Sequence, residues 1–387
     1  MKIYFVTGEP SGDILASSLI KALIKKAPDA EFFGVGGETM KSCGFNSLFD
    51  MSELSVMGFF EVLPRLPLIL KRLKQTVADI ERVSPDVIIT VDSWGFVSEL
   101  LSRLRKKNVR IPKIHYVAPQ VWAWKKGRAK KVARLTDCLM TLLPNEPQYF
   151  EKYGLKSCFV GHPVVETDMD SIDTDGFRKR HGIPETAEIY TVLPGSRNSE
   201  VKRLVPVFKK AAQIIAEKTE NPFFVVPTVE TVAKTVEKIF KSEKIPCCTV
   251  TGRSERYATF KLSKAAIAAS GTVSLELVRC KTPHIVAYRF SSITNFLADI
   301  LIKVKYANLI NILCSSEIIP EFMLKRCRPD LIASKILYFR DKTVADSQIK
   351  QSEEGLQKLY PSAGILPSER AAEIVIEIFL EKKKTDR

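Results

Sequence analysis

The chain has 387 residues, of which 45% are apolar and 27% charged, a composition that excludes a disordered or fibrous protein and provides for about two folded domains. No apolar run approaches the ~18–20 residues that span a bilayer, and the N-terminal apolar run is too short for a signal peptide, so we expect a cytoplasmic protein. Lys and Arg outnumber Asp and Glu by 59 to 44, and the net charge of +15 points to anionic partners, with solubility alone as the alternative.

The first part of the chain alternates short apolar segments with helical patterns. It opens with a strand over residues 2–6, a glycine-bearing turn and a helix over residues 14–26. This alternation is typical of an α/β domain with a parallel sheet. The other elements expected here are strands at 31–35, 85–91, 113–117, 138–143 and 157–160, and helices at 63–83 and 100–107.

An acidic stretch at residues 166–175 shows almost no apolar periodicity, and we interpret it as a linker between domains. The alternation then restarts with strands at 188–193, 222–226, 248–251, 265–269 and 284–288, and with helices at 201–219, 258–264, 273–280 and 371–384. We therefore predict two Rossmann-like domains, 1–165 and 176–345, whose parallel sheets face a cleft. A helical tail, 346–387, is free to pack back on the first domain.

The first strand–helix turn is a candidate ligand site. Ligands of open α/β sheets bind at the carboxyl ends of strands, where glycines such as Gly12 allow close backbone approach. The turn has no G-x-G-x-x-G pattern and no Walker lysine, and the carboxylates of Glu9 and Asp13 favour sugar hydroxyls over phosphate. A plain turn, with Ser11 or Asp13 as a helix cap, is the alternative.

Two further candidates follow the next strands. Asp92 comes directly after the apolar strand 85–91, where a carboxylate can act as a general base, or only cap the next helix. Trp122 and Trp124 precede a basic run at 125–131. Aromatic rings beside cations suit a sugar, a base or a lipid headgroup, although an aromatic corner of the core would look the same.

The apolar stretch at residues 56–70 leads directly into basic side chains. A surface helix of this kind can dip into an anionic membrane interface, but an ordinary helix with its apolar side in the core is equally consistent. The candidate membrane-facing residues are Phe59, Phe60, Leu66, Leu68, Leu70, Lys71 and Arg72.

Two loops in the second half indicate a nucleotide diphosphate site. Gly195 allows close backbone approach after the strand 188–193, and Arg197 can bridge two phosphates. The loop at 270–272 opens a second helix, on which Glu276 can accept both hydroxyls of a ribose. The eight cysteines form no C-x-x-C pair and none lies at zinc spacing with a histidine, so no metal site is expected.

These segments also occur in a familiar order. They are Glu-Pro-Ser-Gly-Asp at 9–13, Met57-Gly58 with Glu61, the Tyr-to-Trp segment at 116–124, Gly-His-Pro at 161–163, Leu-Pro-Gly-Ser-Arg at 193–197, Ser-Gly-Thr to Glu at 270–276, Asn311 and Pro320-Glu321. The chain resembles the lipid-A-disaccharide synthase family of GT-B-fold glycosyltransferases from about residue 3 to residue 335.

The resemblance implies a reaction without a cofactor or metal. UDP-2,3-diacylglucosamine would donate its sugar to 2,3-diacylglucosamine 1-phosphate, giving a β-1′,6-linked disaccharide 1-phosphate and UDP with inversion at the anomeric carbon. Both substrates reside in a membrane, so the resemblance also implies peripheral association with the anionic inner-membrane surface. No nucleic acid is an expected partner, and a homodimer is compatible with the sequence.

The resemblance assigns roles to residues. Asp92 takes the position of the general base, and Arg197, with Ser196, would stabilise the leaving diphosphate. The UDP-contacting set is Gly195, Ser196, Arg197, Gly271, Thr272, Glu276 and Asn311. The set facing the acceptor or the cleft is Glu9, Ser11, Gly12, Asp13, Met57, Glu61, Gln120 and Trp122.

Three positions depart from the family pattern, and two other functions stay open. Ser93-Trp94-Gly95 stands where the family has Pro and Asp, while Ile310 and Leu324 replace a proline and a glutamine. Another UDP-sugar transferase or a UDP-N-acetylglucosamine epimerase would use non-acylated sugars. A basic nucleic-acid-binding protein is disfavoured, because no recognised module is present and the carboxylates of the first loop would repel phosphates.

Overall fold

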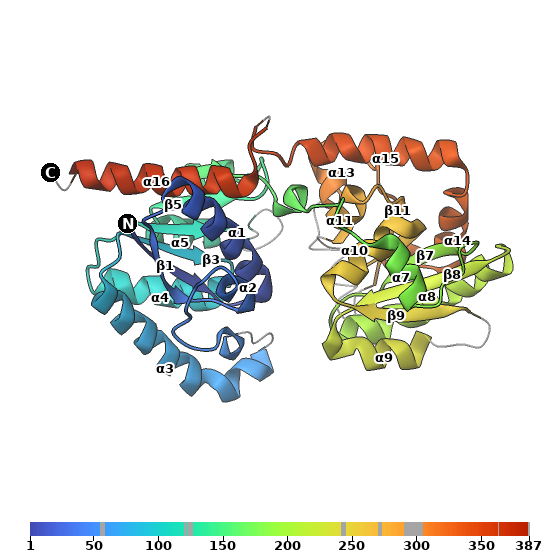
Figure 1. Cartoon of the computed structure of the whole chain (residues 1–387), viewed down its shortest axis with the longest axis horizontal. Coiled ribbons are helices and arrows are strands. Elements are labelled where there is room, and N and C mark those ends of the chain that lie inside the picture. Colours follow the sequence, from blue (N-terminus) through green and yellow to red (C-terminus); the bar gives the residue numbers. More distant parts are fainter. Residues whose placement is uncertain are drawn as a thin grey trace. The chain divides into compact units, whose positions relative to one another are not determined.

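The computed structural model describes all residues except 55–58, 120, 122–126, 241–244, 270–272, 290–304, 363 and 386–387, with only the backbone described at 59–63 and 385. The chain divides into two compact units (Figure 1). Unit 1 comprises Met1–Glu166 and Leu359–Arg387, and unit 2 comprises Thr167–Lys358. The division falls at the start of the acidic stretch 166–175, and the tail 346–387 is shared between the two units.

Unit 1 is built on a six-stranded parallel sheet in the order β2-β1-β3-β4-β5-β6. Every residue of β3 is buried, because helices cover both faces of the sheet, and this explains why the strand is apolar except for Thr90. The strands are β1 (Lys2–Thr7), β2 (Glu31–Val35), β3 (Val87–Val91), β4 (Lys113–Tyr116), β5 (Cys138–Thr141) and β6 (Lys156–Phe159).

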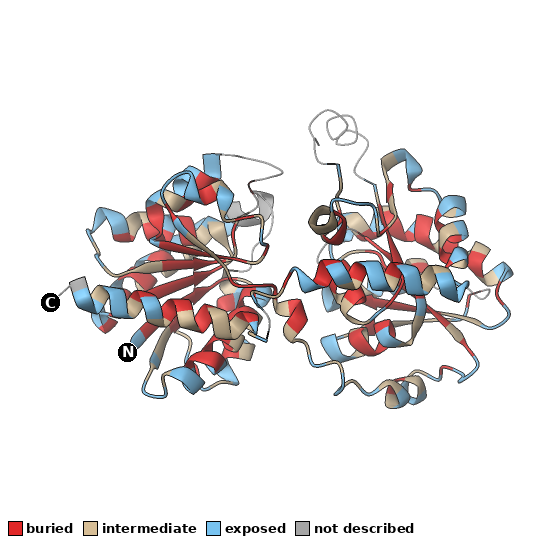
Figure 2. Ribbon diagram, turned by 90° about the horizontal axis from the view of Figure 1, so that it is seen from above, coloured by how far each residue is buried: buried red, intermediate tan, exposed pale blue. Residues whose placement is uncertain are grey.

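The helices of unit 1 form two layers, one on each face of the sheet (Figures 1 and 2). Helices α1 and α16 pack against Ile3 and Phe5, whereas α3 and α4 pack against Tyr4 and Val6, as the alternation of side chains along a strand requires. The helices are α1 (Pro10–Lys26), α2 (Glu38–Lys41), α3 (Phe59–Val83), α4 (Trp94–Lys106), α5 (Gly127–Leu135), α6 (Gln148–Glu151) and α16 (Pro367–Thr385), with 3-10 turns at Met51–Glu53 and Pro163–Glu166.

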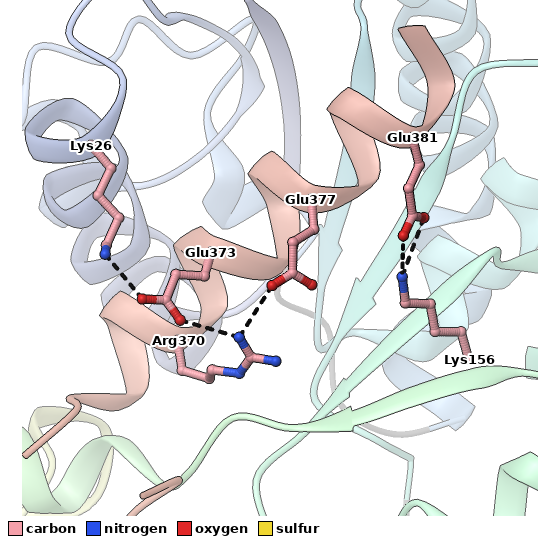
Figure 3. Close-up of polar contacts among 6 residues, drawn as sticks. All are labelled: Lys26, Lys156, Arg370, Glu373, Glu377 and Glu381. Carbon is pink, nitrogen blue, oxygen red and sulfur yellow. Dashed lines mark hydrogen bonds and ion pairs between the residues drawn. The ribbon is translucent and has the colours of Figure 1, made fainter. Parts of the chain in front are cut away.

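Helix α16 returns the end of the chain to unit 1, where it lies beside α1. Its apolar face, which includes Ile374, is fully buried in the core formed with α1 and the sheet. Ion pairs border this face (Figure 3). They join Lys26 to Glu373 at 3.1 Å, Arg370 to Glu373 at 3.1 Å and to Glu377 at 3.3 Å, and Lys156 to Glu381 at 3.0 Å.

Unit 2 repeats the plan with a six-stranded parallel sheet in the order β12-β11-β10-β7-β8-β9. Helices α8, α9 and α14 pack on one face, and α7, α10 and α11 on the other. The strands are β7 (Glu188–Leu193), β8 (Pro222–Thr228), β9 (Cys247–Thr251), β10 (Ser263–Ala268), β11 (His284–Tyr288) and β12 (Glu321–Met323). The helices are α7 (Thr174–Arg180), α8 (Asn198–Glu217), α9 (Glu230–Phe240), α10 (Arg253–Leu262), α11 (Val273–Arg279), α13 (Leu309–Cys314), α14 (Pro329–Tyr338) and α15 (Lys342–Gln357), with a 3-10 turn at Leu324–Arg326.

Each sheet contains one point at which the strand order reverses. In unit 1 the chain passes from β1 outward to β2 and then crosses to β3 on the other side of β1. In unit 2 it passes from β7 through β8 to β9 and then crosses to β10. Loops diverge at such a switch point, and this is where open α/β sheets bind ligands. The prediction of two Rossmann-like parallel sheets is confirmed.

Some predicted helix boundaries were wrong. The helix predicted to begin at residue 63 begins at Phe59 and contains both Pro64 and Pro67. The helix predicted over 258–264 lies at Arg253–Leu262, and the strand after it begins at once. No helix in the described part of the chain is both long enough and apolar enough to cross a membrane.

The buried face of α16 should matter more for stability than its ion pairs. Ile374→Ala is expected to lower the free energy of unfolding of unit 1 by about 2–5 kcal/mol, because a fully buried side chain leaves a cavity. Lys156→Ala, which breaks an exposed ion pair, should cost less than about 1 kcal/mol. Urea unfolding followed by circular dichroism, fitted with one transition for each unit, measures both; equal losses would contradict this ranking.

Candidate functional site

The switch point of unit 1 brings Ser11, Gly12 and Asp92 together. The carboxyl ends of β1 and β3 are level, since Thr7 pairs with Val91. The Ser11 hydroxyl donates a hydrogen bond to Asp92 Oδ2 at 3.4 Å. A side chain at Gly12 would place its Cβ 3.3 Å from the Val91 carbonyl oxygen, so this glycine allows α1 to start close against the end of β3.

Asp92 lies in a strained turn. Asp92 and Ser93 both have left-handed backbone conformations, with φ of 52° and 43°, which few residues other than glycine adopt. The Asp92 amide donates to the Tyr116 carbonyl at 2.9 Å, and Asp92 Oδ1 accepts from the Ser93 amide at 2.9 Å. Strain of this kind persists only where its surroundings impose it, and it is concentrated at functional sites.

Gly8 and a buried polar layer support this turn. A Cβ at Gly8 would lie 2.8 Å from the Ser93 hydroxyl oxygen, which is itself buried and has no hydrogen-bond partner in the described part of the chain. Behind the turn, the ring of Trp94 lies 4.9 Å from that of His115. Burial lowers the pKa of His115 to about 3, so this imidazole is neutral at physiological pH and supports the turn without titrating.

Asp13 has a structural role inside unit 1, and its predicted contact with the acceptor stays a prediction. Its buried carboxylate accepts hydrogen bonds from the backbone amides of Gly37 and Thr39, both at 2.7 Å, and of Met40 at 3.2 Å. Asp13 therefore holds the start of α2, and its oxygens are already engaged before any sugar binds. Glu9 is the half-buried residue that precedes α1. No sequence pattern links Asp13 to α2, because the partners lie 24 to 27 residues away.

The switch point of unit 2 holds the loop predicted to bind a diphosphate. Gly195 has a φ of 98°, and a Cβ there would lie 2.6 Å from Glu200 Oε2. Ser196 and Arg197 are exposed at the start of α8, whose N-terminal backbone amides favour an anion. These residues therefore border one potential phosphate-binding surface.

Two residues that the sequence did not reveal hold this loop by hydrogen bonds. They are Glu200 and Tyr288. Glu200 Oε1 accepts from Arg197 Nη1 at 3.1 Å and from the Tyr288 hydroxyl at 3.1 Å. The Arg197 amide donates to Glu200 Oε2 at 3.4 Å, which is one of the two hydrogen bonds of a capping box at the start of α8. The three-residue spacing from Arg197 could have indicated the role of Glu200. No local pattern could have indicated Tyr288, because it lies on another strand, β11.

Glu276 lies on α11 with one oxygen occupied and one unsatisfied. Arg256 Nη2 donates to Glu276 Oε1 at 2.9 Å. Glu276 Oε2 is buried and has no hydrogen-bond partner among the residues that the structure describes. Burial raises the pKa of this carboxyl, while Arg256 and Arg253 act to lower it. The side chain therefore has one acceptor oxygen that a ligand hydroxyl can bind.

Asn311 has a structural role inside unit 2, and its predicted contact with the nucleotide stays a prediction. Its amide nitrogen donates to the Ile319 carbonyl at 2.7 Å and to Glu321 Oε1 at 2.9 Å. Its amide oxygen accepts from the backbone amides of Ile318 and Ile319 at 2.9 and 2.8 Å. All of its hydrogen-bonding capacity is thus used inside unit 2, where it holds the segment before β12.

The exposed part of α3 carries some of the predicted membrane-facing residues. Leu66 and Leu70 are 46% and 39% exposed, Leu68 is half-buried and Lys71 is exposed. Arg72, another residue predicted to face the membrane, is engaged inside unit 1. It pairs with both carboxylate oxygens of Glu53 at 2.6 Å and lies over the Phe49 ring, so it anchors α3 to the loop before it.

Several predicted site residues lie outside the described residues. They are Met57, Gln120, Trp122, Gly271 and Thr272, together with the side chains of Phe59, Phe60 and Glu61. Within the described ranges, no group of three or more His, Cys, Asp or Glu side chains could hold a metal ion.

Two Rossmann-like units with ligand-type loops at both switch points define the GT-B class of proteins. Solved structures of this fold are similar to the chain, among them UDP-GlcNAc 2-epimerase from Neisseria meningitidis bound to UDP-GlcNAc (TM-score 0.68, 11% identity, 98% of this chain and 100% of that one). A glycosyltransferase from Rickettsia africae is another (TM-score 0.58, 13% identity, 98% and 97%). At these identities the likeness shows the fold alone.

The sequence identifies the family. The model of the lipid-A-disaccharide synthetase family matches residues 3–375, and the chain belongs to this family. Lipid-A-disaccharide synthase of Paramagnetospirillum magneticum is 44% identical over 99% of both chains. That of Rhodospirillum centenum is 42% identical over 100% of this chain and 96% of its own. The predicted family is confirmed, and the chain is a glycosyltransferase.

Substitution of Asp13 and substitution of Asp92 should affect the stability of unit 1 differently. Asp13→Ala is expected to destabilise unit 1 by about 3 kcal/mol, since three backbone donors lose their partner at about 1 kcal/mol each. Asp92→Asn should change stability by less than about 1 kcal/mol, because Asn also tolerates the left-handed conformation. Urea unfolding of the two variants beside wild type tests this; an unchanged Asp13→Ala variant would refute the capping role.

Proposed function

We propose that this chain joins UDP-2,3-diacylglucosamine to 2,3-diacylglucosamine 1-phosphate, giving the β-1′,6-linked disaccharide 1-phosphate and UDP. The observation that carries the proposal is the family match over residues 3–375, together with relatives of that name that are 44% and 42% identical over at least 99% of this chain. The UDP-GlcNAc bound to the similar Neisseria epimerase supports a UDP-sugar donor. The reaction is one in-line displacement, in which the acceptor 6-oxygen bonds to the anomeric carbon as the bond to UDP breaks.

Asp92 is the proposed general base for the acceptor hydroxyl. Its carboxylate is half-buried at the switch point of unit 1, in a turn that its surroundings hold in a strained conformation. The Ser11 hydroxyl and the Ser93 amide donate to its two oxygens and fix its orientation. A base held in advance accepts the 6-hydroxyl proton without a further cost in ordering its side chain.

Arg197, Ser196 and the start of α8 are the proposed group that stabilises the leaving UDP. Arg197 is exposed, and Glu200 holds its guanidinium at the edge of the loop. Negative charge increases on the diphosphate as the sugar–oxygen bond breaks, so fixed donors at this loop lower the energy of the transition state. Glu276 is the proposed acceptor for the ribose hydroxyls, since its Oε2 has no donor in the described part of unit 2.

Helix α3 is the proposed contact with the inner membrane. Leu66 and Leu70 are exposed beside the cationic side chains of Arg65, Lys71 and Lys74. This combination favours an anionic interface, where apolar side chains enter the headgroup region and cations remain near the phosphates. Peripheral association would allow the enzyme to reach acylated substrates.

The first test measures UDP release and disaccharide formation with the two acylated substrates. Asp92→Asn and Arg197→Ala are each expected to lower kcat at least about a hundredfold, because each removes a group that acts on the transition state. Asp86→Asn is the matched control, since Asp86 precedes the strand that Asp92 follows and accepts a hydrogen bond from the Lys2 amide.

The outcomes test the general base and the reaction separately. Full activity of Asp92→Asn would move the base to another residue and leave the reaction standing. Turnover of a non-acylated UDP-sugar in place of the acylated pair would overturn the reaction itself.

Membrane association is tested with vesicles of phosphatidylglycerol and phosphatidylethanolamine. Leu66→Ser with Leu70→Ser should weaken binding at least about tenfold, because two apolar side chains no longer enter the interface. Added salt should weaken the wild type further. Leu331→Ser is the control, as Leu331 is 37% exposed on unit 2. Unchanged binding of the double variant would place the membrane contact elsewhere.

A further inference from the structure

The ion pair between Arg256 and Glu276 is incomplete. The two residues come from helices α10 and α11, which pack together through Tyr257, Phe260 and Leu277. Arg256 reaches Glu276 Oε1 through Nη2 alone, at 2.9 Å. A guanidinium and a carboxylate can form two parallel hydrogen bonds, so this pair is held through only one of them.

Unsatisfied atoms lie on both sides of that single bond. Glu276 Oε2 and Arg256 Nε are each buried with no hydrogen-bond partner among the described residues. Buried polar atoms without a partner are rare and call for an explanation, for which a ligand or an ordered water is the usual one. Because Glu276 is already the proposed ribose acceptor, a ligand hydroxyl accounts for the open Oε2.

Nearby positive charge favours the ionised form of the Glu276 carboxylate. Burial raises the pKa of Glu276, and the groups that lower it are Arg256 first, then Arg253, with a contribution from the Tyr257 hydroxyl. The Cys280 thiol also faces this carboxylate, and burial raises its pKa to about 12, so it is neutral at physiological pH. Of these groups, only Arg256 combines positive charge with a direct ion pair to Glu276.

We propose that Arg256 is a positioning residue for nucleotide recognition, which holds Glu276 Oε1 and leaves Oε2 to accept a ribose hydroxyl of UDP. The inference rests on the proposed function, since it concerns how that site holds the nucleotide. Arg256 acts through Glu276, with which it forms an ion pair. Its charge lowers the pKa of the buried carboxyl, and its hydrogen bond to Oε1 leaves Oε2 to face the ribose.

Two neighbouring arginines show why the role belongs to Arg256. Arg253 lies one turn earlier on α10, but it donates to the Thr167 hydroxyl at 3.2 Å. Arg279 lies on the same helix as Glu276, but it donates to the Thr167 carbonyl at 3.3 Å. Both arginines bind Thr167, the first residue of unit 2, and neither forms an ion pair with Glu276. Arg253 has the same charge as Arg256 and lies on the same helix, so it supplies a matched control.

The experiment measures binding of UDP and of 2′-deoxyuridine 5′-diphosphate to the full chain by calorimetry. Wild type is expected to bind the deoxy compound at least about tenfold more weakly, because a hydrogen bond to a charged acceptor is lost. In Arg256→Gln this preference should fall to about threefold or less, through weaker binding of UDP. Arg253→Gln should keep the wild-type preference.

The pH dependence provides a second readout that a purely structural role would not change. Protonation of Glu276 removes the hydroxyl acceptor, so UDP affinity falls as pH falls. Without Arg256 the pKa of Glu276 rises further, and the acid-side loss of UDP affinity should move to higher pH in Arg256→Gln. Binding of the deoxy compound should move less.

Thermal unfolding checks that each variant is folded. The variant Arg256→Lys retains the positive charge, so it should restore the pH dependence of UDP affinity more than it restores the preference for UDP over the deoxy compound. Full hydroxyl preference with an unchanged pH profile in Arg256→Gln overturns the positioning role. Equal binding of the two nucleotides by wild type overturns it as well, by removing Glu276 from the ribose. Failure of wild type to bind either nucleotide is a different result, since it refutes the proposed function.

Discussion

Burial of both faces of each parallel sheet is the constraint on which the rest of this structure depends. Helices cover the faces, so every side chain of a strand such as β3 is buried and none of them faces a ligand in solvent. Chemistry is confined to the loops at the strand ends. The reversal of strand order then selects, in each unit, the pair of loops that diverge, and Asp92 and Gly195 lie in these loops.

Glycines in the two loops allow the backbone to approach neighbouring groups closely. Gly8 and Gly12 allow the first turn and helix to meet the end of β3, where Asp92 and Ser93 adopt left-handed conformations. Gly195 likewise allows a close approach, because a Cβ at this position would collide with the Glu200 carboxylate. The carboxylates close to these loops differ in their hydrogen-bond partners. Asp13 is saturated by backbone amides, Glu200 holds a loop and an arginine, and Glu276 keeps one oxygen without a donor in the described part of the chain.

The excess of positive charge has more than one use in the described part of the chain. Arg72 anchors α3 through Glu53, and Arg256 pairs with a buried carboxylate, so neither adds to a free cationic surface. Lys71 remains exposed beside Leu66 and Leu70, and these are the residues that suit an anionic interface. A net charge of +15 therefore says little about which cations meet a membrane until each ion pair is known.

The sequence by itself determined the α/β class, most strands, the two glycine-bearing loops and the family, because apolar periodicity and local motifs are properties of neighbouring residues. It also placed Asp92 and Arg197 at the ends of strands. Only the tertiary structure decided what each polar side chain does. Asp13, Asn311 and Arg72 are held by partners distant in the chain, and Glu200, Tyr288 and Arg256 gain their roles from helices and strands that meet only on folding. Hydrogen-bond partners are set by packing, and packing is not local.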